Sequence, residues 1–169
     1  SVPYALYAKT AGNVKKYSVG DFAQGGIVFW VDETGQHGLV SAKKDQSIGA
    51  NVKWGNDVGT FGYTMAEGDG VYSGEMNTIL IMAKEGINDG SPYAAKICSS
   101  YSVTESGITY GDWYLPSKEE LNLMRQNKTI INTTAVSNGG NNLSSFYWSS
   151  TEFSNEKAWY QVFSGTDTT

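Results

Sequence analysis

The sequence predicts a single α+β domain, with strands near both ends of the chain and helices between them. Three observations predict this class: a β-rich run at 27–31, apolar residues at helical spacing within 76–83, and a second β-rich segment at 146–163. A chain of 169 residues with 40% hydrophobic content is long enough to bury one core. Since the first and last elements are both strands, we expect the terminal strands to pair in one antiparallel sheet.

The first part of the chain predicts an arm, a hairpin and a loop. Residues 1–16 are small, apolar and lightly charged, so we expect an N-terminal arm or stalk end there and the domain itself over 17–169. The β-rich runs 27–31 and 38–42 flank a glycine-containing turn, which predicts a hairpin. Residues 43–74 hold seven glycines and predict a long Gly-rich loop.

The middle of the chain predicts two or three short helices. The first covers 76–83 and ends at Gly86, and the second covers 93–98, just after a proline. The clearest helix start is Ser117-Lys-Glu-Glu120, which predicts a capping box. In it the side chain of Ser117 accepts from the backbone N–H of Glu120, and the side chain of Glu120 accepts from the backbone N–H of Ser117.

The last part of the chain predicts a linker and a second hairpin. Residues 127–142 are polar, and we expect a linker there. The runs 146–151 and 158–163 then predict two strands, which are joined by a turn at 154–157.

Composition excludes several classes of protein. The net charge is −5 and Arg125 is the only arginine, so the phosphate and base contacts of nucleic-acid binding are nearly unattainable. No apolar run approaches the roughly 20 residues that span a bilayer, so we expect no membrane insertion. Cys98 is the only cysteine; it cannot form an internal disulfide, and we expect a small buried hydrophobic residue.

Catalytic and metal-binding patterns are absent from the sequence, and we expect no enzyme and no cofactor. There is no Gly-x-Ser-x-Gly elbow and no phosphate-binding loop, and the single histidine, His37, falls in the first hairpin turn. Calcium is the alternative, because Glu67-Gly-Asp-Gly70 and Asn88-Asp-Gly90 place oxygen ligands on turns. Asp-Gly and Asn-Asp-Gly are also among the commonest turn-forming sequences.

The C-terminal quarter carries the signal for binding. Seven aromatic side chains between 146 and 163 are interleaved with Ser, Thr and Asn, a mixture typical of adaptable binding surfaces. Strand alternation places Tyr160 and Val162 on the face opposite Trp159, Gln161 and Phe163. We therefore expect one face to be buried and the other, with the turn and the tail 164–169, to meet a partner.

Several motifs together resemble a family of bacterial surface domains, the C-terminal domain of the Legionella collagen-like adhesin. The resemblance runs from about Tyr17 to the end of the chain and rests on segments that begin at Gly25 (GGIVFWV), Gly35 (GQHGLV), Asp112 (DWYLPSKEEL), Tyr147 (YWSSTE) and Ala158 (AWYQ). The segment Trp113-Tyr-Leu-Pro-Ser117 is also similar to a motif of formylglycine-generating-enzyme-like domains. Both groups, and the variable proteins of diversity-generating retroelements, have a C-type-lectin-like fold.

This resemblance implies an adhesin or receptor-binding head that is displayed on a cell surface or a phage particle and contacts a protein or glycan on another cell. A hypervariable protein diversified by a retroelement is one form of it. The alternative is a structural subunit of a surface fibre, pilus or phage tail fibre, in which the N-terminal arm would form an oligomer.

Carried over by position, the resemblance assigns ligand binding and scaffold roles to separate residues. The ligand-binding residues it implies are Ser154, Asn155, Tyr160, Val162, Ser164, Thr166 and Thr168. The scaffold residues it implies are Trp113, Leu115, Phe146, Trp148 and Trp159.

The sequence departs from these families at three points. It lacks the sugar motif of calcium-dependent lectins and the paired cysteines of formylglycine-generating enzymes, so neither activity is implied. It also lacks the Arg-Val-Arg strand with which relatives close the domain beside the N-terminal strand, so we expect the final strand to be missing from these 169 residues.

Overall fold

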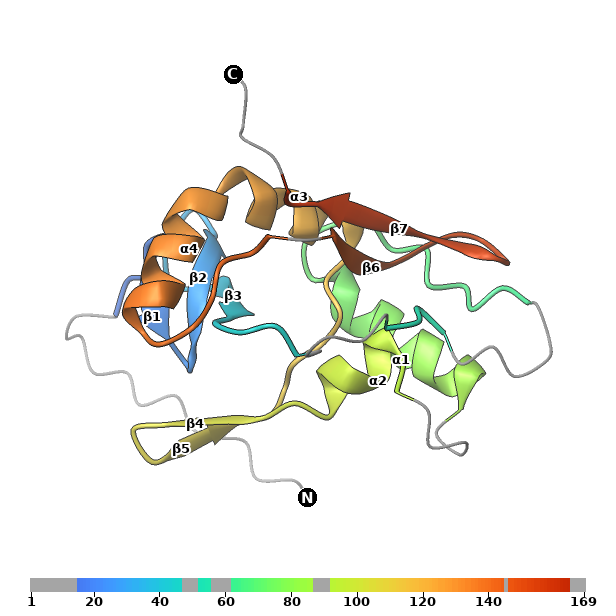
Figure 1. Ribbon diagram of the computed structural model, residues 1–169, viewed down its shortest axis with the longest axis horizontal. Coiled ribbons are helices and arrows are strands. Elements are labelled where there is room, and N and C mark those ends of the chain that lie inside the picture. Colours follow the sequence, from blue (N-terminus) through green and yellow to red (C-terminus); the bar gives the residue numbers. More distant parts are fainter. Residues whose placement is uncertain (1–14, 47–51, 56–61, 87–91, 145, 165–169) are drawn as a thin grey trace.

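The computed structural model describes residues 15–46, 52–55, 62–86, 92–144 and 146–164 (Figure 1). Over these residues the fold is α+β, as predicted, with helices and small antiparallel sheets. In chain order the elements are β1 (Phe22–Ala23), β2 (Gly26–Val31), β3 (Gly38–Ala42), α1 (Ser73–Glu85), α2 (Ala94–Ser99), β4 (Val103–Glu105), β5 (Ile108–Tyr110), α3 (Lys118–Gln126), α4 (Lys128–Ser137), β6 (Phe146–Ser154) and β7 (Lys157–Val162).

The first predicted hairpin is confirmed. Strands β2 and β3 pair antiparallel, from Val31 opposite Gly38 next to the turn to Gly26 opposite Ala42 at the far end. Strand β1 pairs with the other edge of β2. The turn between β2 and β3 is organised by Asp32. Its carboxylate accepts hydrogen bonds from the backbone N–H of Thr34 at 3.1 Å and from the Thr34 hydroxyl at 2.8 Å. Gly35 takes the left-handed conformation (φ 69°) that this turn requires and that glycine adopts without strain.

The three predicted helices are also present. Helix α1 ends at Gly86 (φ 74°), whose backbone N–H donates to the carbonyl oxygen of Met82. Helix α2 follows Tyr93, and α3 begins with the complete capping box of Ser117 and Glu120. The second hairpin, β6–β7, is confirmed as well, with its turn at Asn155 and Glu156.

Two predictions about the fold are wrong, and the first concerns the helix count. The described residues contain four helices, because α4 occupies most of the segment that was predicted to be a polar linker. Its Thr, Asn and Ser residues have modest helix propensity and mask the pattern. Tertiary packing nevertheless stabilises the helix, since Ile131 and Ala135, four residues apart, are both buried in the core.

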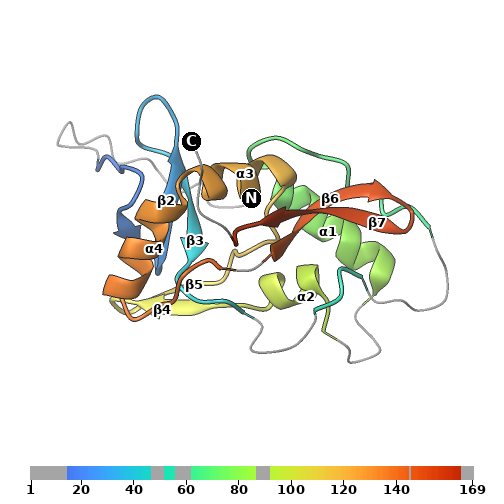
Figure 2. The same cartoon turned by 45° about the horizontal axis from the view of Figure 1, so that its top comes forward.

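The second correction concerns the terminal strands, which do not pair with each other among the described residues. The sheet β1-β2-β3 and the hairpin β6-β7 are separate, with α3 between them (Figures 1 and 2). Both edges of β2 are already paired, with β1 and β3. At the end of β7, Arg125 donates to the carbonyl oxygen of Val162 at 3.1 Å, so α3 covers that end of the strand.

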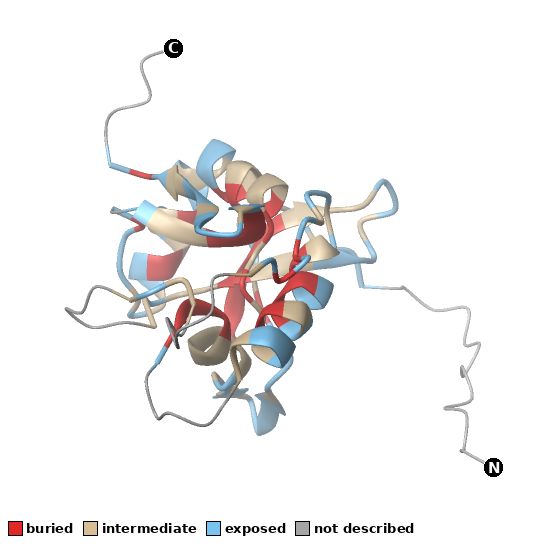
Figure 3. Ribbon diagram, turned by 90° about the vertical axis from the view of Figure 1, so that its right-hand side faces the viewer, coloured by how far each residue is buried: buried red, intermediate tan, exposed pale blue. Residues whose placement is uncertain are grey.

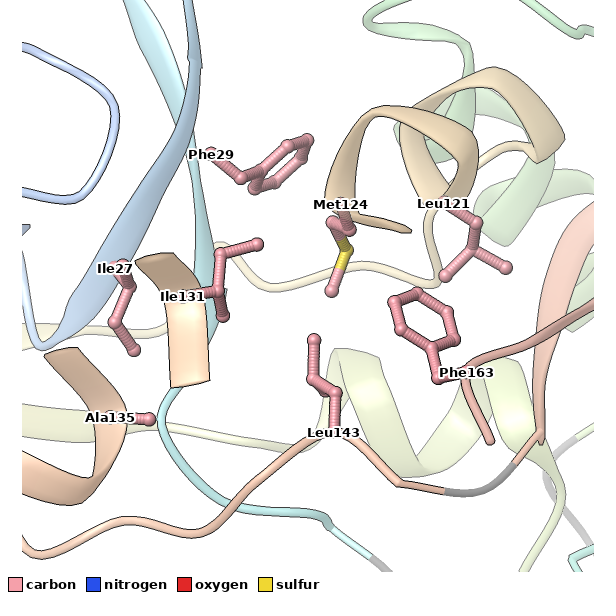
Figure 4. Close-up of a cluster of buried hydrophobic side chains, with 8 residues drawn as sticks. All are labelled: Ile27, Phe29, Leu121, Met124, Ile131, Ala135, Leu143 and Phe163. Atoms are coloured by element: carbon pink, nitrogen blue, oxygen red, sulfur yellow. The ribbon is translucent and has the colours of Figure 1, made fainter. Parts of the chain in front are cut away.

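Side chains connect the two ends of the chain instead. One buried cluster combines residues of β2, α3 and α4 with two residues that flank the C-terminal hairpin: Ile27, Phe29, Leu121, Met124, Ile131, Ala135, Leu143 and Phe163 (Figure 4). A second cluster joins α1 and α2 to the segment before α3 through Ile81, Tyr93, Ala94, Ala95 and Leu115, with Ala66 beside them. Figure 3 shows these buried segments gathered in the middle of the molecule. None of the described helices is long and apolar enough to cross a bilayer.

Candidate functional site

The β6–β7 hairpin exposes a group of large apolar side chains. In its register Trp148 lies opposite Tyr160 and Phe146 opposite Val162, so these four side chains share one face. The rings of Phe146, Trp148 and Tyr160 meet edge to face, with centroids 5.9–6.3 Å apart. Phe146 is 53% exposed, Tyr160 57% and Val162 41%, whereas Trp148 packs inward on the second cluster.

A second aromatic pair lies nearer the turn of the same hairpin. Phe153 and Trp159 contact edge to face with centroids 4.9 Å apart, and they are 58% and 40% exposed. The ammonium of Lys118, the first residue of α3, lies 4.8 Å from the centre of the Trp159 ring and 2.8 Å from the carboxylate of Asp69. We call Phe146, Phe153, Trp159, Tyr160 and Val162 the hairpin surface; a charged pair lies at its border.

Buried polar contacts hold this hairpin on the rest of the molecule. The residues from Ser149 to Glu152 are all buried, and the backbone N–H of Ser150 donates to the carbonyl oxygen of Pro116 at 2.8 Å. Two tryptophans connect the hairpin to the segment 52–54. The indole N–H of Trp148, on the hairpin, donates to the carbonyl oxygen of Val52 at 2.9 Å, and the indole N–H of Trp54 donates to the carbonyl oxygen of Ser149, on the hairpin, at 2.7 Å. The base of the hairpin is therefore fixed, while its outer part is open to solvent.

The structure places the predicted ligand-binding residues at different points of the hairpin. Tyr160 and Val162 lie close together on the exposed face. Ser154 and Asn155 are at the turn, where the hydroxyl of Ser154 accepts from the backbone N–H of Glu156 at 3.3 Å. Ser164 is exposed beyond the end of β7. Thr166 and Thr168 lie outside the described residues.

The predicted division into a buried and a free face is wrong. Leu115 is buried as expected, and Trp113 and Trp148 are half-buried, but Phe146 and Trp159 are exposed although they were assigned to the scaffold. The register of β6 shifts between Trp148 and Glu152 and again before Ser154, so alternation cannot be extended along the whole strand. Both faces of the outer hairpin are open to solvent, which alternation alone does not indicate.

A second candidate region was missed by sequence reasoning: an apolar groove of about 800 Å³ in the middle of the molecule. We call it the central groove. It lies between β3, α2, α3 and the start of β6, and its lining includes Val40, Cys98, Trp113, Met124, Leu143 and Tyr147. Residues more than 100 positions apart line it together, so no local pattern could have indicated it. The hydroxyl of Tyr147 donates to Asp45 at 2.8 Å, and burial raises the pKa of this tyrosine.

Burial shifts the pKa of two further titratable groups near these regions. Burial raises the pKa of the Cys98 thiol to about 12, which keeps it protonated near neutral pH. Burial also raises the pKa of Glu120, although its carboxylate accepts from the backbone N–H groups of Ser117 and Tyr72 and from the hydroxyl of Tyr114. His37 lies exposed in the first hairpin turn, where its backbone carbonyl accepts from Asp32.

The turns considered for calcium are only partly described. The carboxylate of Asp69 is paired with Lys118, and the described residues contain no group of three or more His, Cys, Asp or Glu side chains that could hold a metal ion. The segment Asn88-Asp-Gly90 lies outside the described residues.

Comparisons with protein-family models, with curated proteins and with solved structures found no match to this chain. The chemistry of the two regions is therefore the basis for a functional assignment. The hairpin surface offers aromatic rings for stacking and a charged pair for hydrogen bonds, and the central groove offers a concave apolar space.

Proposed function

We propose that this chain is an extracellular ligand-binding module with a C-type-lectin-like fold, an adhesin or receptor-binding head, and that the hairpin surface contacts its ligand. The ligand is a protein or glycan on another cell surface. One observation carries the proposal: five large apolar side chains of a single hairpin are 40–58% exposed, although the base of the same hairpin, from Ser149 to Glu152, is buried.

The composition of this surface supports binding. Exposed apolar side chains that gather on one element of a soluble domain mark interaction sites more often than scattered ones do. Trp and Tyr are enriched among the residues that dominate binding energy, because their large rings lose little conformational entropy. Lys118 and Asp69 add hydrogen-bonding groups beside Trp159, as in a polar border around an apolar centre.

The family resemblance supports the same region. Among the residues that the resemblance implies for ligand binding, Tyr160 and Val162 belong to the hairpin surface, and Ser154 and Asn155 lie at its turn. The exposed rings of Phe146 and Trp159 extend the proposed site beyond that set.

A binding screen tests the proposal. The 169-residue chain is screened against arrayed glycans and bacterial surface proteins, and each hit is measured again with Trp159→Ala and Tyr160→Ala. The matched control is Ile108→Ala, because Ile108 is 57% exposed on β5, away from the hairpin (Figure 1). We expect each hairpin variant to weaken binding about tenfold or more and the control to leave it unchanged. Equal binding by all three variants would exclude the hairpin surface as the site.

A further inference from the structure

The segment 69–72 leads into α1 and contacts the first turn of α3, and we call it the border segment. The hydroxyl of Ser117 donates to the carbonyl oxygen of Gly70 at 2.9 Å, across 47 positions of the chain. The backbone N–H of Glu119 donates to the carbonyl oxygen of Asp69 at 3.3 Å. The place of the border segment therefore depends on the start of α3.

The border segment carries one half of the charged pair that lies beside the hairpin surface. The carboxylate of Asp69 is 2.8 Å from the ammonium of Lys118, and the same ammonium is 4.8 Å from the centre of the Trp159 ring. A cation over an aromatic face is attracted by the charge distribution of the ring. A displacement of the border segment would therefore move Asp69, draw Lys118 from its place and change the surroundings of Trp159.

Glu120 fixes the end of the border segment next to α1. Its side chain is fully buried, and its Oε1 accepts from the backbone N–H of Tyr72 at 2.7 Å and from the hydroxyl of Tyr114 at 3.1 Å. Its Oε2 accepts from the backbone N–H of Ser117 at 2.7 Å. Tyr72 has a left-handed backbone (φ 69°), which residues other than glycine seldom adopt and which persists only where the surroundings hold it. The bond to Glu120 is one such contact.

The groups around Glu120 are hydrogen-bond donors and further titratable side chains. From α1, Gly74 lies so close to Oε2 that a side chain at this position would overlap with it. Burial and then the charge of Glu120 raise the pKa of Tyr114, and burial, Asp32 and Glu120 raise the pKa of Tyr72. The other charged groups of the packed elements are Glu75 of α1, Asp69 of the border segment, and Lys118 and Glu119 of α3.

A proton on Glu120 conflicts with this arrangement. A carboxylate only accepts hydrogen bonds, whereas one oxygen of a protonated carboxyl group donates. Each oxygen already faces a backbone N–H, and only the hydroxyl of Tyr114 can reverse from donor to acceptor. Protonation also removes the charge of the acceptor, and hydrogen bonds to an ionised acceptor are roughly twice as strong as neutral ones. The bond to Tyr72 is therefore weaker when Glu120 is protonated.

The fold itself tolerates this proton. Burial raises the pKa of Glu120 above the ordinary value of 4.5, because a buried neutral carboxyl group is more stable than a buried charge. Protonation thus favours the folded state as a whole, while it weakens the local contact with the border segment.

We propose that Glu120 is a positioning residue for the hairpin surface: when ionised it holds the border segment, and with it Asp69 and Lys118, beside Trp159, and when protonated it releases them. The proposal rests on the proposed function, because the surface that Glu120 regulates is the proposed ligand-binding surface. Binding through Trp159 is then tighter when Glu120 is ionised than when it is protonated.

A pH titration by nuclear magnetic resonance tests this coupling without a ligand. In the ¹⁵N-labelled 169-residue chain, two signals are followed from about pH 8 to about pH 4. They are the backbone N–H of Tyr72 and the indole N–H of Trp159, which is identified by its loss in Trp159→Phe. We expect both signals to shift with one common midpoint above pH 4.5, because both report the ionisation of Glu120. Different midpoints, or a Trp159 signal that does not shift, would overturn the proposal.

Three variants separate Glu120 from the other acidic groups. Glu120→Gln keeps the shape of the side chain without its charge, so its Trp159 signal near neutral pH should lie at the low-pH position of the wild type. Glu119→Gln removes the same charge one residue earlier and should titrate like the wild type. In Asp69→Asn, Tyr72 should still shift with Glu120, whereas Trp159 should no longer follow it.

The decisive comparison is between the wild type and Glu120→Gln. A Trp159 signal that titrates alike in both would overturn the proposal, because another group would then control its surroundings. Since the titration contains no ligand, its failure would exclude the positioning role of Glu120, and only the binding screen bears on the proposed function.

Discussion

The carboxylate of Glu152 on β6 accepts the backbone N–H of Thr64, with both oxygens 3.0 Å from the nitrogen. One of these oxygens also accepts from Met65 at 3.1 Å. All three groups lie at the junction between the hairpin and the end of the long Gly-rich loop, and the side chain of Glu152 is buried. A single acidic side chain therefore fastens the segment 62–69, in which the structure has no helix or strand, to the base of the proposed binding hairpin.

Replacing Glu152 should destabilise the protein. Glu152→Ala leaves two backbone N–H groups without their acceptor, and we expect a loss of about 2–3 kcal/mol in the free energy of unfolding, measured by urea denaturation. Glu156→Ala removes an exposed carboxylate from the turn of the same hairpin and serves as the control, with little expected change. If both variants unfold at the same urea concentration as the wild type, Glu152 does not hold the loop.

The two partners in the Trp148↔Tyr160 pair should respond differently to substitution. Trp148→Ala removes a ring that packs on the second cluster together with its hydrogen bond to Val52, and should cost about 3 kcal/mol of stability. Tyr160→Ala removes an exposed ring and should cost less than about 1 kcal/mol. Thermal and urea unfolding of both variants measure the difference. A large loss of stability in Tyr160→Ala would show that this ring is structural.

Glu120 should make stability depend on pH in a direction opposite to that of most carboxylates. Burial raises its pKa in the folded protein above the ordinary value of 4.5. The folded state therefore binds the proton more tightly, and the contribution of Glu120 to stability falls as the pH rises from about 4.5 through the raised pKa.

Glu120→Gln removes this titration but not the others. The free energy of unfolding of the wild type minus that of Glu120→Gln should therefore decrease as the pH rises above the ordinary pKa of 4.5 and through the raised pKa of Glu120. A difference that is independent of pH would contradict the raised pKa.

Alkylation of Cys98 should be slow in the folded protein. Because burial raises its pKa to about 12, the rate of reaction with iodoacetamide should still be rising at pH 10. In urea-unfolded protein the rate should level off just above the ordinary value of 9.0. A plateau near pH 9 in the folded protein would mean that the thiol is solvated.

The elements that could be predicted from sequence are those formed by near neighbours in the chain. The capping box of Ser117 and Glu120 needs residues three positions apart, and the β2–β3 hairpin needs a turn of a few residues. Helix α4 could not be predicted, because most of its residues are Thr, Ile, Val, Asn or Ser, which have modest helix propensity. Its stability comes from packing Ile131 and Ala135 into the core cluster beside Ile27 and Leu143.

The candidate site was predictable only in part, for a related physical reason. Position in the chain and aromatic content identified the C-terminal hairpin, and Tyr160 and Val162 are indeed exposed there. The exposure of Phe146 and Trp159 could not be predicted, because it depends on how the hairpin packs on the rest of the molecule through contacts distant in sequence, such as the one from Ser150 to Pro116.

The sequence by itself determined the α+β class, the two hairpins, the helix start at Ser117 and the aromatic richness of the C-terminal quarter, because short-range sterics and hydrogen bonds decide these features. Only the tertiary structure decided that the terminal strands lie in separate sheets, that Glu152 fastens the loop at Thr64, and that β3 and β6 border an apolar groove. Each of these depends on which surfaces meet after the chain has collapsed. Burial energy, which is not directional, selects that arrangement from the whole chain rather than from any local pattern.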